Sequence, residues 1–335
     1  MVKKKSSGEG REKLIHEIKW LLDLPSDLKS YFSEILEYDI QSDEVYFDVP
    51  YYGSRNLREH IFDGHFDSAR AITFLENLLD WMFENVYSRK ISKAPANWVE
   101  EKHIKRVLDR LEPCSQRSAD LGRLINAKEI KINGVNYRNV REIFTEIRKN
   151  TDFVQAVSPK ELIMIHGDLH FQNILIYPHN PKGFMLVDPR GELAGSDLYY
   201  DMGKLYHSFH GKYDFIHSDQ FTLDLSWNED YPVVNYELIN EYAVNIYDEI
   251  CSRFTTFIQK YDLIKGDPYW EMKSLFAEAA DFCSVSVFHI AKTKDAKRAL
   301  MLYLVGVELI NKFYDKYLIN NVWKRIRSKS VDWKC

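Results

Sequence analysis

The sequence is poor in cysteine and contains no long hydrophobic run. Its four cysteines, Cys114, Cys251, Cys283 and Cys335, are widely separated and form no C-x-x-C pair. This spacing excludes a disulfide framework and a cysteine-rich zinc module, and it favours a reducing compartment. No apolar stretch reaches the length of a membrane span, and no hydrophobic signal segment follows the N-terminal lysines. We therefore expect a cytoplasmic protein with no membrane partner.

An excess of basic charge is also missing. The 335 residues carry a formal net charge of −5, with a pI near 6.1, so nothing in the composition favours a nucleic-acid partner. The short basic runs at residues 3–5 and 324–329 are typical of solvated termini. What is present is a folded composition, with 45% hydrophobic and 14% aromatic residues. A chain of this length can bury a substantial core as one domain or two lobes.

The hydrophobic periodicity predicts an α+β protein in which helices dominate. "REKLIHEIKWLLDLP" has the pattern of an amphipathic helix, and "YFSEILEYDI" and "EVYFDVPYY" have the pattern of strands around a turn. Residues 67–150 are mainly helical in pattern, with an Asn-Gly hairpin signal in "KEIKINGVNYRN". Three long helical patterns follow residue 235. Between these regions, the apolar runs "ELIMI" and "FMLVD" predict two short strands around a polar loop.

This polar loop holds the residue types that phosphoryl transfer requires. Transfer from ATP to a hydroxyl needs a group that accepts the proton and a divalent metal held by hard oxygen ligands. "HGDLHFQN" supplies Asp168 as the candidate base and Asn173 as a neutral oxygen ligand. "LVDPRG" supplies Asp188 as a charged ligand. The spacing therefore indicates a base and a magnesium site within one loop region.

These motifs resemble those of the aminoglycoside phosphotransferase and choline kinase family, whose members are relatives of protein kinases. The family's H-G-D-x-x-x-x-N motif matches at His166, Gly167, Asp168 and Asn173, whereas protein kinases more often have arginine at the second position. Asp188 begins "DPRG" where a protein kinase has D-F-G. The resemblance implies a protein-kinase-like two-lobe fold. The lobes would be a reduced N-terminal nucleotide-binding lobe (residues 1–55) and a large helical C-terminal lobe (residues 56–335).

The resemblance also implies roles for neighbouring residues. "GSDLYYDMGKL" is similar to the family's D-x-x-x-D segment, whose second aspartate, here Asp201, braces the catalytic loop. Asp197 remains available to the acceptor pocket. His166 would support catalysis by bracing the same loop through hydrogen bonds. His166 and His170 are also spaced as a possible zinc pair, but they lie in a loop rather than on the helix of an H-E-x-x-H site.

In this fold, a lysine on a strand pairs with the α- and β-phosphates, and a glutamate on the next helix holds the lysine. The N-terminal helix offers Glu17, with Glu12 as a lesser candidate. The only strand before that helix is "VKKKSS", in which Lys4 is the first choice, followed by Lys5 and Lys3. The alternative is a basic N-terminus with no binding role.

The N-terminal lobe departs from the family pattern. The hinge would lie at the end of "VYFDVPYY", where backbone groups near Val49 and Tyr51 would bind adenine. No glycine-rich phosphate loop precedes the lysine. We therefore expect three strands rather than five and weak ATP binding by this chain alone. The lobe is either a natural short form or is completed by upstream sequence, and we expect a partner chain or a helix to cover its open sheet edge.

The sequence thus predicts an ATP- and magnesium-dependent phosphotransferase that acts on a hydroxyl of a small molecule. The acceptor classes are sugars, amino alcohols and aminoglycoside-like compounds, and "DPRG" favours a sugar-like or surface-polysaccharide precursor. Arg190 is expected to contact phosphate or substrate, or else to form a structural salt bridge. Two alternatives stay open. One is a nucleotide-binding pseudokinase with a regulatory role, and the other is a protein kinase, which Gly167 and the missing A-P-E-like segment oppose.

Overall fold

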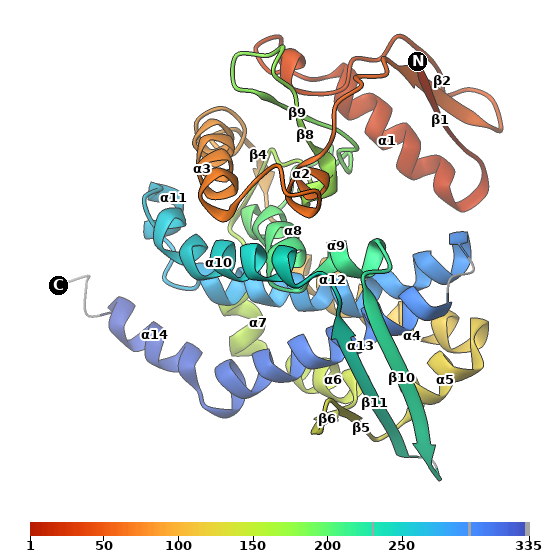
Figure 1. The fold of residues 1–335 in the computed structure, drawn as a ribbon. Helices are drawn as coiled ribbons and strands as arrows, with labels where there is room; N and C mark the ends of the chain where they lie inside the picture. The colour runs from red at the N-terminus through yellow and green to blue at the C-terminus, as the bar shows by residue number, and fades with distance from the viewer. Residues whose placement is uncertain (230, 294–295, 332–335) are drawn as a thin grey trace. The chain divides into compact units, whose positions relative to one another are not determined.

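The computed structural model describes residues 1–229, 231–293 and 296–331, and helices dominate over strands in them (Figure 1). This agrees with the predicted α+β class. The chain forms two compact units. The first unit comprises residues 1–93 and 160–205, and the second comprises residues 94–159 and 206–335. The predicted boundary between residues 55 and 56 does not coincide with this division, because residues 56–93 and both predicted catalytic loops belong to the first unit.

The first unit alternates short strands with helices. Its elements are β1 (Val2–Ser6), α1 (Arg11–Leu22), β2 (Glu37–Asp39), β3 (Val45–Val49), α2 (Leu57–Phe62), α3 (Ser68–Asn85), β4 (Lys90–Lys93), β7 (Glu161–Ile163), β8 (Ile174–Ile176), β9 (Phe184–Leu186) and α8 (Leu198–Phe209), of which the residues up to Leu205 belong to this unit.

A three-stranded sheet with the order β1-β3-β2 forms the N-terminal part of the first unit. Both pairs are antiparallel, and the register sets Lys4 opposite Phe47. Within the described residues, this sheet has the predicted three strands. Within the described chain β3 is the only strand that pairs with β1, so one edge of β1 carries unpaired backbone groups.

Helix α1 follows β1 and packs its apolar side into the first unit. Leu14, Ile18 and Leu21 are buried, as the periodicity predicts. Leu22 is 39% exposed, because it ends the helix. Trp20 is buried instead, where its ring meets an aromatic ring of the loop that follows the helix.

The strands around the polar loop pair differently from the predicted hairpin. "ELIMI" contributes β7, which pairs with β4 rather than with "FMLVD". β9 pairs with β8, formed by the three apolar residues directly after Asn173. A turn centred on Asn180 closes this β8–β9 hairpin, since its side-chain oxygen accepts the backbone N–H groups of Lys182 and Gly183. The loop is therefore held by two separate strand pairs.

The second unit is mainly helical. Its elements are α4 (Lys105–Arg117), α5 (Ala119–Asn126), β5 (Glu129–Ile132), β6 (Val135–Arg138), α6 (Val140–Lys149), α7 (Thr151–Val157), α9 (Tyr213–His217), β10 (Phe221–Asn228), β11 (Tyr231–Leu238), α10 (Glu241–Ile258), α11 (Asp262–Lys265), α12 (Trp270–Thr293), α13 (Ala296–Tyr314) and α14 (Val322–Val331), with π-helical turns at Glu100–Ile104 and Asp315–Ile319. The three long helices predicted after residue 235 are α10, α12 and α13. The last two pack against each other.

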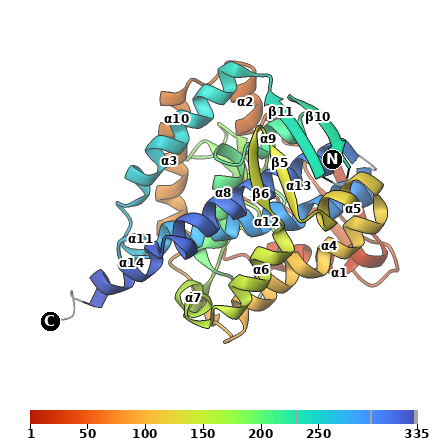
Figure 2. The same ribbon diagram turned by 90° about the horizontal axis from the view of Figure 1, so that it is seen from below.

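A four-stranded sheet with the order β10-β11-β5-β6 lies in the second unit (Figure 2). β5 and β6 form the predicted hairpin. Asn133 and Gly134 at its turn both have positive φ, 47° and 84°, as a type I′ turn requires. β10 and β11 were not predicted, although "FTLDLSWN" alternates apolar and polar residues.

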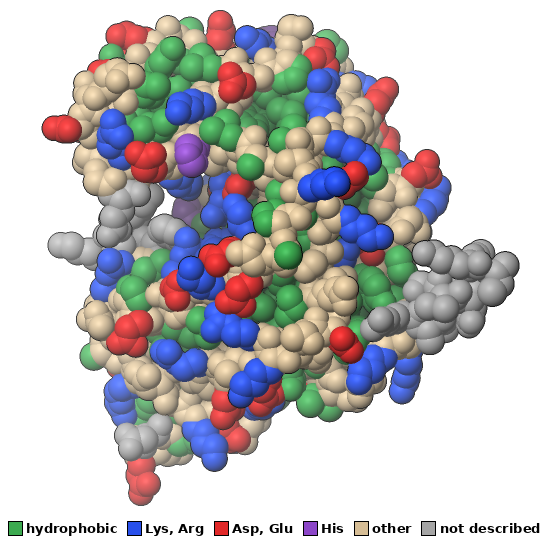
Figure 3. All heavy atoms as spheres, turned by 180° about the vertical axis from the view of Figure 1, so that it is seen from behind, with side chains coloured by type: hydrophobic (Ala, Val, Ile, Leu, Met, Phe, Trp, Pro, Cys, Tyr) green, Lys and Arg blue, Asp and Glu red, His purple; other side chains and the backbone are tan. Residues whose placement is uncertain are grey.

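The charged side chains on the face drawn in Figure 3 are mixed, with Lys and Arg lying among Asp and Glu. This mixture agrees with the small net charge of −5. Among the described residues, no helix combines the length and the apolar character that crossing a membrane requires.

Candidate active site

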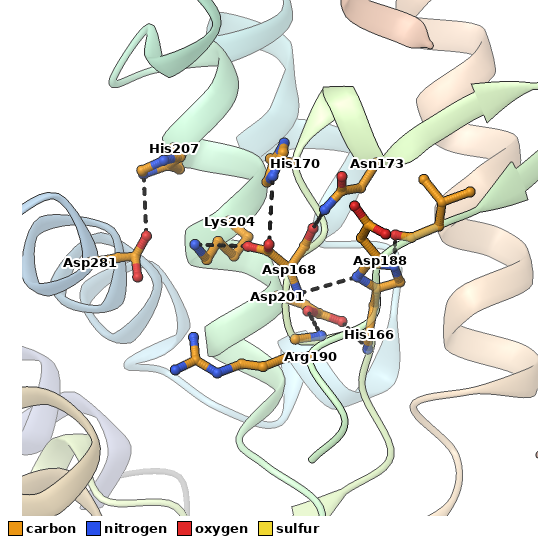
Figure 4. A network of polar contacts seen from close by, with 12 residues as sticks. His166, Asp168, His170, Asn173, Asp188, Arg190, Asp201, Lys204, His207 and Asp281 are labelled. Carbon is orange, nitrogen blue, oxygen red and sulfur yellow. Dashed lines mark hydrogen bonds and ion pairs between the residues drawn. The ribbon is translucent and has the colours of Figure 1, made fainter. Parts of the chain in front are cut away.

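A buried carboxylate, that of Asp201, holds the loop that begins with His166 and Gly167. Asp201, in the first turn of α8, accepts the backbone N–H of His166 at 2.9 Å through Oδ2 and that of Gly167 at 2.7 Å through Oδ1 (Figure 4). The Tyr87 hydroxyl donates to Oδ2 at 3.1 Å. Burial raises the pKa of Asp201 to about 7. The predicted bracing contacts from Asp201 to this loop are present.

The imidazole of His166 is a second brace. Its Nε2 lies 2.9 Å from the Val187 carbonyl oxygen, and its Nδ1 accepts the backbone N–H of Asp168 at 3.2 Å. This pattern assigns the proton to Nε2. Burial lowers the pKa of His166 to about 4, so the ring is neutral at physiological pH.

Because backbone groups engage both ring nitrogens of His166, neither is available to a metal ion. This argues against the zinc pair of His166 and His170 that their spacing left open. Within the part of the chain that the structure describes, no three or more His, Cys, Asp or Glu side chains gather in a way that could hold a metal ion. The geometry favours the bracing role of His166.

Asp168 has a lysine as its closest charged neighbour. The Nζ of Lys204, on α8, lies 2.9 Å from Asp168 Oδ1, and the lysine side chain is only 8% exposed. The Nε2 of His170 is 3.7 Å from Oδ2. Burial alone would raise the pKa of Asp168, but Lys204 and then His170 outweigh burial and hold the pKa well below its usual range. Asp168 is therefore ionised at neutral pH.

The β8–β9 hairpin brings the two candidate metal ligands together. Asn173 directly precedes β8, and its carbonyl oxygen accepts the Val187 N–H at 3.0 Å, so Asp188 follows the residue opposite Asn173. The amide nitrogen of Asn173 donates to the Asp168 carbonyl at 2.8 Å, which fixes how its side-chain oxygen points. The carboxylate of Asp188 is 58% exposed.

An amide oxygen and a carboxylate are hard ligands that fit magnesium. Magnesium usually keeps several waters and takes only one or two carboxylates from the protein, with substrate phosphates completing the shell. Asp188 also has a positive φ of 56°, in the left-handed region that aspartate tolerates better than most residues. Such backbone conformations concentrate at functional sites.

Lys4 and Glu17 form the predicted ion pair. The Nζ of Lys4 lies 2.7 Å and 2.8 Å from the two carboxylate oxygens of Glu17 and 3.2 Å from Asp188 Oδ1. The Glu17 side chain is 3% exposed and that of Lys4 is 38% exposed. Burial would lower the pKa of Lys4, but Asp188 and Glu17 outweigh burial and raise it. Burial raises the pKa of Glu17, and Lys4 offsets only part of this effect.

The lesser candidates for the same ion pair point elsewhere. Side chains alternate along a strand, so Lys3 and Lys5 leave β1 on the opposite face from Lys4. Lys3 contacts Asp48 at 3.4 Å, and Lys5 contacts Glu44 at 3.1 Å in an exposed pair. Glu12 is 73% exposed and pairs with its neighbour on the helix. The geometry therefore selects Lys4 and Glu17 from the predicted alternatives.

Gly191 holds the loop of Asp188 against helix α1. Its φ is 75°, and a Cβ at this position would lie 2.5 Å from the Glu17 nitrogen and 2.5 Å from the His16 carbonyl carbon. No side chain fits in this space, because both neighbours are helix backbone. The loop and the helix that carries Glu17 are thus in direct backbone contact.

Arg190 lies in the same loop, and its guanidinium is engaged by protein groups. The Nε is 3.1 Å from Glu192, and the Tyr200 hydroxyl is a second partner. Its backbone N–H donates to the His166 carbonyl at 2.9 Å. The structural salt bridge that the sequence left open is present, while a contact with phosphate remains a prediction.

The candidate hinge residues lie at the end of β3. Val49 is the last residue of that strand and pairs with Val2. Tyr51 follows with a side chain that is 75% exposed. Asp197, the expected acceptor residue, is 6% exposed and accepts the Tyr199 N–H at 3.4 Å. The binding of adenine by the hinge and of the acceptor by Asp197 remain predictions.

Sequence reasoning missed Lys204 and Tyr87. Lys204 lies three residues after Asp201, so the two share one face of α8. The eight residues from Asp201 to Ser208 are all buried. A buried lysine requires an anionic partner, but its burial is known from the structure, so the three-residue spacing from Asp201 was the available signal in the sequence. Tyr87 carried no comparable signal, since nothing local connects it with Asp201.

No protein-family model and no curated protein matches this chain.

Proposed function

We propose that this protein is an ATP-dependent phosphotransferase with a protein-kinase-like two-lobe fold, acting on a hydroxyl of a small molecule in the cytoplasm. In this proposal Asp168 accepts the hydroxyl proton, Asn173 and Asp188 hold magnesium, and Lys4 and Glu17 hold the nucleotide phosphates. The resemblance to the aminoglycoside phosphotransferase and choline kinase family is the source of these roles.

The observation that supports the proposal best is the cluster of Lys4, Glu17 and Asp188. These residues come from a strand, a helix and a loop that are far apart in the sequence, and Lys4 contacts both carboxylates. Kinase catalysis requires a lysine–glutamate ion pair and a metal-binding aspartate to be in place together. A glutamate that is 3% exposed needs a counter-charge, and here that charge comes from the strand that precedes its helix, as in the kinase fold.

Each residue of the proposed site has a separate role in the reaction. The ionised Asp168 lies in a loop that Asp201 and His166 hold rigid, and a fixed base needs no rearrangement during the reaction. Lys4 offers its ammonium group to phosphate oxygens. Magnesium, when bound at Asn173 and Asp188, would supply charge neutralisation of the phosphate oxygens. Gly191 allows the loop of Asp188 to lie directly against the helix that carries Glu17.

A second candidate function is nucleotide binding without turnover. It is favoured by the three-stranded sheet, which is smaller than the five-stranded lobe of a complete kinase-like fold. It is opposed by Asp168, Asn173 and Asp188, all of which carry the side chains that turnover requires. The acceptor of the favoured function is a sugar, an amino alcohol or an aminoglycoside-like compound.

Isothermal titration with ATP, with and without magnesium, tests the nucleotide site. We expect heat of binding that depends on magnesium and that is lost in Lys4→Met. Lys5→Met is the matched control, because Lys5 lies on the same strand but its exposed pair with Glu44 faces away. Equal ATP affinity in Lys4→Met and in the wild type would contradict the assignment of Lys4.

A further inference from the structure

The two carboxylate oxygens of Asp168 have different surroundings. Oδ1 lies 2.9 Å from the Nζ of Lys204, within range of a charge-assisted hydrogen bond. Oδ2 has His170 Nε2 at 3.7 Å, which is too long for a hydrogen bond. Figure 4 shows the lysine and the histidine approaching the carboxylate from different directions. Oδ1 therefore has a close cation, while Oδ2 has a more distant imidazole.

The side chain of Lys204 is buried. It is 8% exposed, and it leaves α8 one turn after Asp201, which accepts the backbone N–H groups of His166 and Gly167. Asp168 is 29% exposed, so the carboxylate can reach a bound molecule while the lysine behind it cannot. The buried ammonium of Lys204 can therefore position the partly exposed carboxylate of Asp168, but it cannot contact the substrate itself.

We propose that Lys204 is a positioning residue that binds Oδ1 of Asp168 and so leaves Oδ2 as the oxygen that receives the proton of the acceptor hydroxyl. The proposal rests on the proposed phosphotransferase function. In the step it describes, the hydroxyl O–H bond breaks and its proton moves to Oδ2. The acceptor oxygen bonds to the γ-phosphorus of ATP as the bond to the β,γ-bridging oxygen breaks, and ADP leaves with that electron pair.

Lys204 lies on helix α8, and Asp168 and His170 lie in the catalytic loop. His170 stands beside Oδ2 and flanks the position that the acceptor hydroxyl would occupy. If Lys204 were absent, the carboxylate could rotate and either oxygen could face the acceptor. A misplacement of about 1 Å in a reacting group can cost roughly 10²-fold in rate. Loss of Lys204 is therefore expected to slow catalysis without weakening ATP binding.

A double-mutant cycle tests whether Lys204 acts through Asp168. It compares wild type, Lys204→Met, Asp168→Asn and the double variant, with kcat and KM for ATP measured for each against a panel of hydroxylated acceptors. Lys204→Arg is the conservative variant. Lys273→Met is the matched control, because Lys273 forms a similarly buried ion pair in the second unit, at 2.6 Å from Asp267 with a side chain that is 10% exposed.

We expect Lys204→Met to lower kcat about 10²-fold with KM for ATP nearly unchanged, and Lys204→Arg to recover part of the loss. In the Asp168→Asn background the same change should have no further effect, because the base it positions is gone. Lys273→Met should keep the wild-type kcat. Folding is checked by thermal unfolding of every variant. Lys204→Arg, which keeps the positive charge beside Asp168, serves if Lys204→Met is unstable.

Three results would overturn the inference while leaving the function intact: wild-type kcat in Lys204→Met, an equal loss of kcat in Lys273→Met, or a loss in the Asp168→Asn background as large as in the wild type. The last would mean that Lys204 acts on something other than Asp168. A wild-type chain that binds ATP but phosphorylates no acceptor would refute the proposed function, and the inference would fall with it.

Discussion

Replacing Lys4 by methionine should destabilise the fold in a way that depends on pH. The change keeps the length of the apolar stem but removes the cation that contacts both oxygens of Glu17. The glutamate side chain is 3% exposed, so water cannot take the place of the lysine. The carboxylate would be left buried without its main counter-charge.

The expected loss in the free energy of unfolding follows from the burial of Lys4 and Glu17. Removing one partner of a buried ion pair costs about 3–5 kcal/mol. The side chain of Lys4 is 38% exposed, and solvent screening weakens exposed pairs, so we expect a loss at the lower end, about 3 kcal/mol at pH 8. Changing Glu17 to glutamine in addition should recover most of the loss, because no buried charge then remains.

The pH dependence has a definite sign. Burial already raises the pKa of Glu17 above its unfolded value, and loss of Lys4 raises it further. A carboxyl with a raised folded pKa lowers the free energy of unfolding as pH rises from the unfolded pKa to the folded one. The cost of Lys4→Met should therefore be smaller at pH 5 than at pH 8.

Urea denaturation of wild type, Lys4→Met and Lys4→Met/Glu17→Gln at pH 5 and pH 8 measures these differences. Lys5→Met is the control, and its exposed pair with Glu44 should contribute less than about 1 kcal/mol. An equal loss at both pH values, or a loss in Lys4→Met no greater than in Lys5→Met, would refute the reasoning.

Further predictions concern the catalytic loop. Asp168→Asn should reduce kcat about 10²–10⁴-fold and leave ATP affinity nearly intact, which steady-state kinetics and titration would check. Asp188→Ala should abolish magnesium-dependent ATP binding, and Asn173→Ala should weaken it less, since only the first removes a charged ligand; calorimetry with and without magnesium separates them. Burial raises the pKa of Asp201 to about 7, so its contribution to the free energy of unfolding should fall as pH rises from about 4 to 7, by on the order of 4 kcal/mol. Urea denaturation across this range should show a shallower pH slope in Asp201→Asn; an unchanged slope would contradict the assignment.

The sequence predicted best where one local pattern carries the information. The Asn-Gly turn of the β5–β6 hairpin and the long helices have local signals that packing did not override. The ion pair of Lys4 and Glu17 was predicted from the resemblance to kinases and not from a local pattern. In the kinase fold, a lysine on a strand pairs with a glutamate on the next helix. The structure has that pair with two short contacts.

The sequence failed where partners are chosen across long distances in the chain. Nothing local shows that β7 pairs with β4 rather than with β9, because short apolar strands carry no signal for their neighbours. β10 and β11 were missed although β10 alternates apolar and polar residues. The role of Lys204 depends on Asp168, which lies far earlier in the sequence, and the helical pattern around the lysine does not reveal this partner.

The most direct test of the proposed function is acceptor-dependent phosphoryl transfer. The chain would be incubated with ATP and magnesium against a panel of sugars, amino alcohols and aminoglycosides, with ADP formation measured and the phosphorylated acceptor identified by mass spectrometry. We predict that at least one acceptor is phosphorylated on a hydroxyl by the wild type and that Asp168→Asn, although it binds ATP, forms that product about 10²–10⁴-fold more slowly. Equal product formation by wild type and Asp168→Asn would contradict the account, as would a wild-type chain that binds ATP and magnesium but phosphorylates no member of the panel.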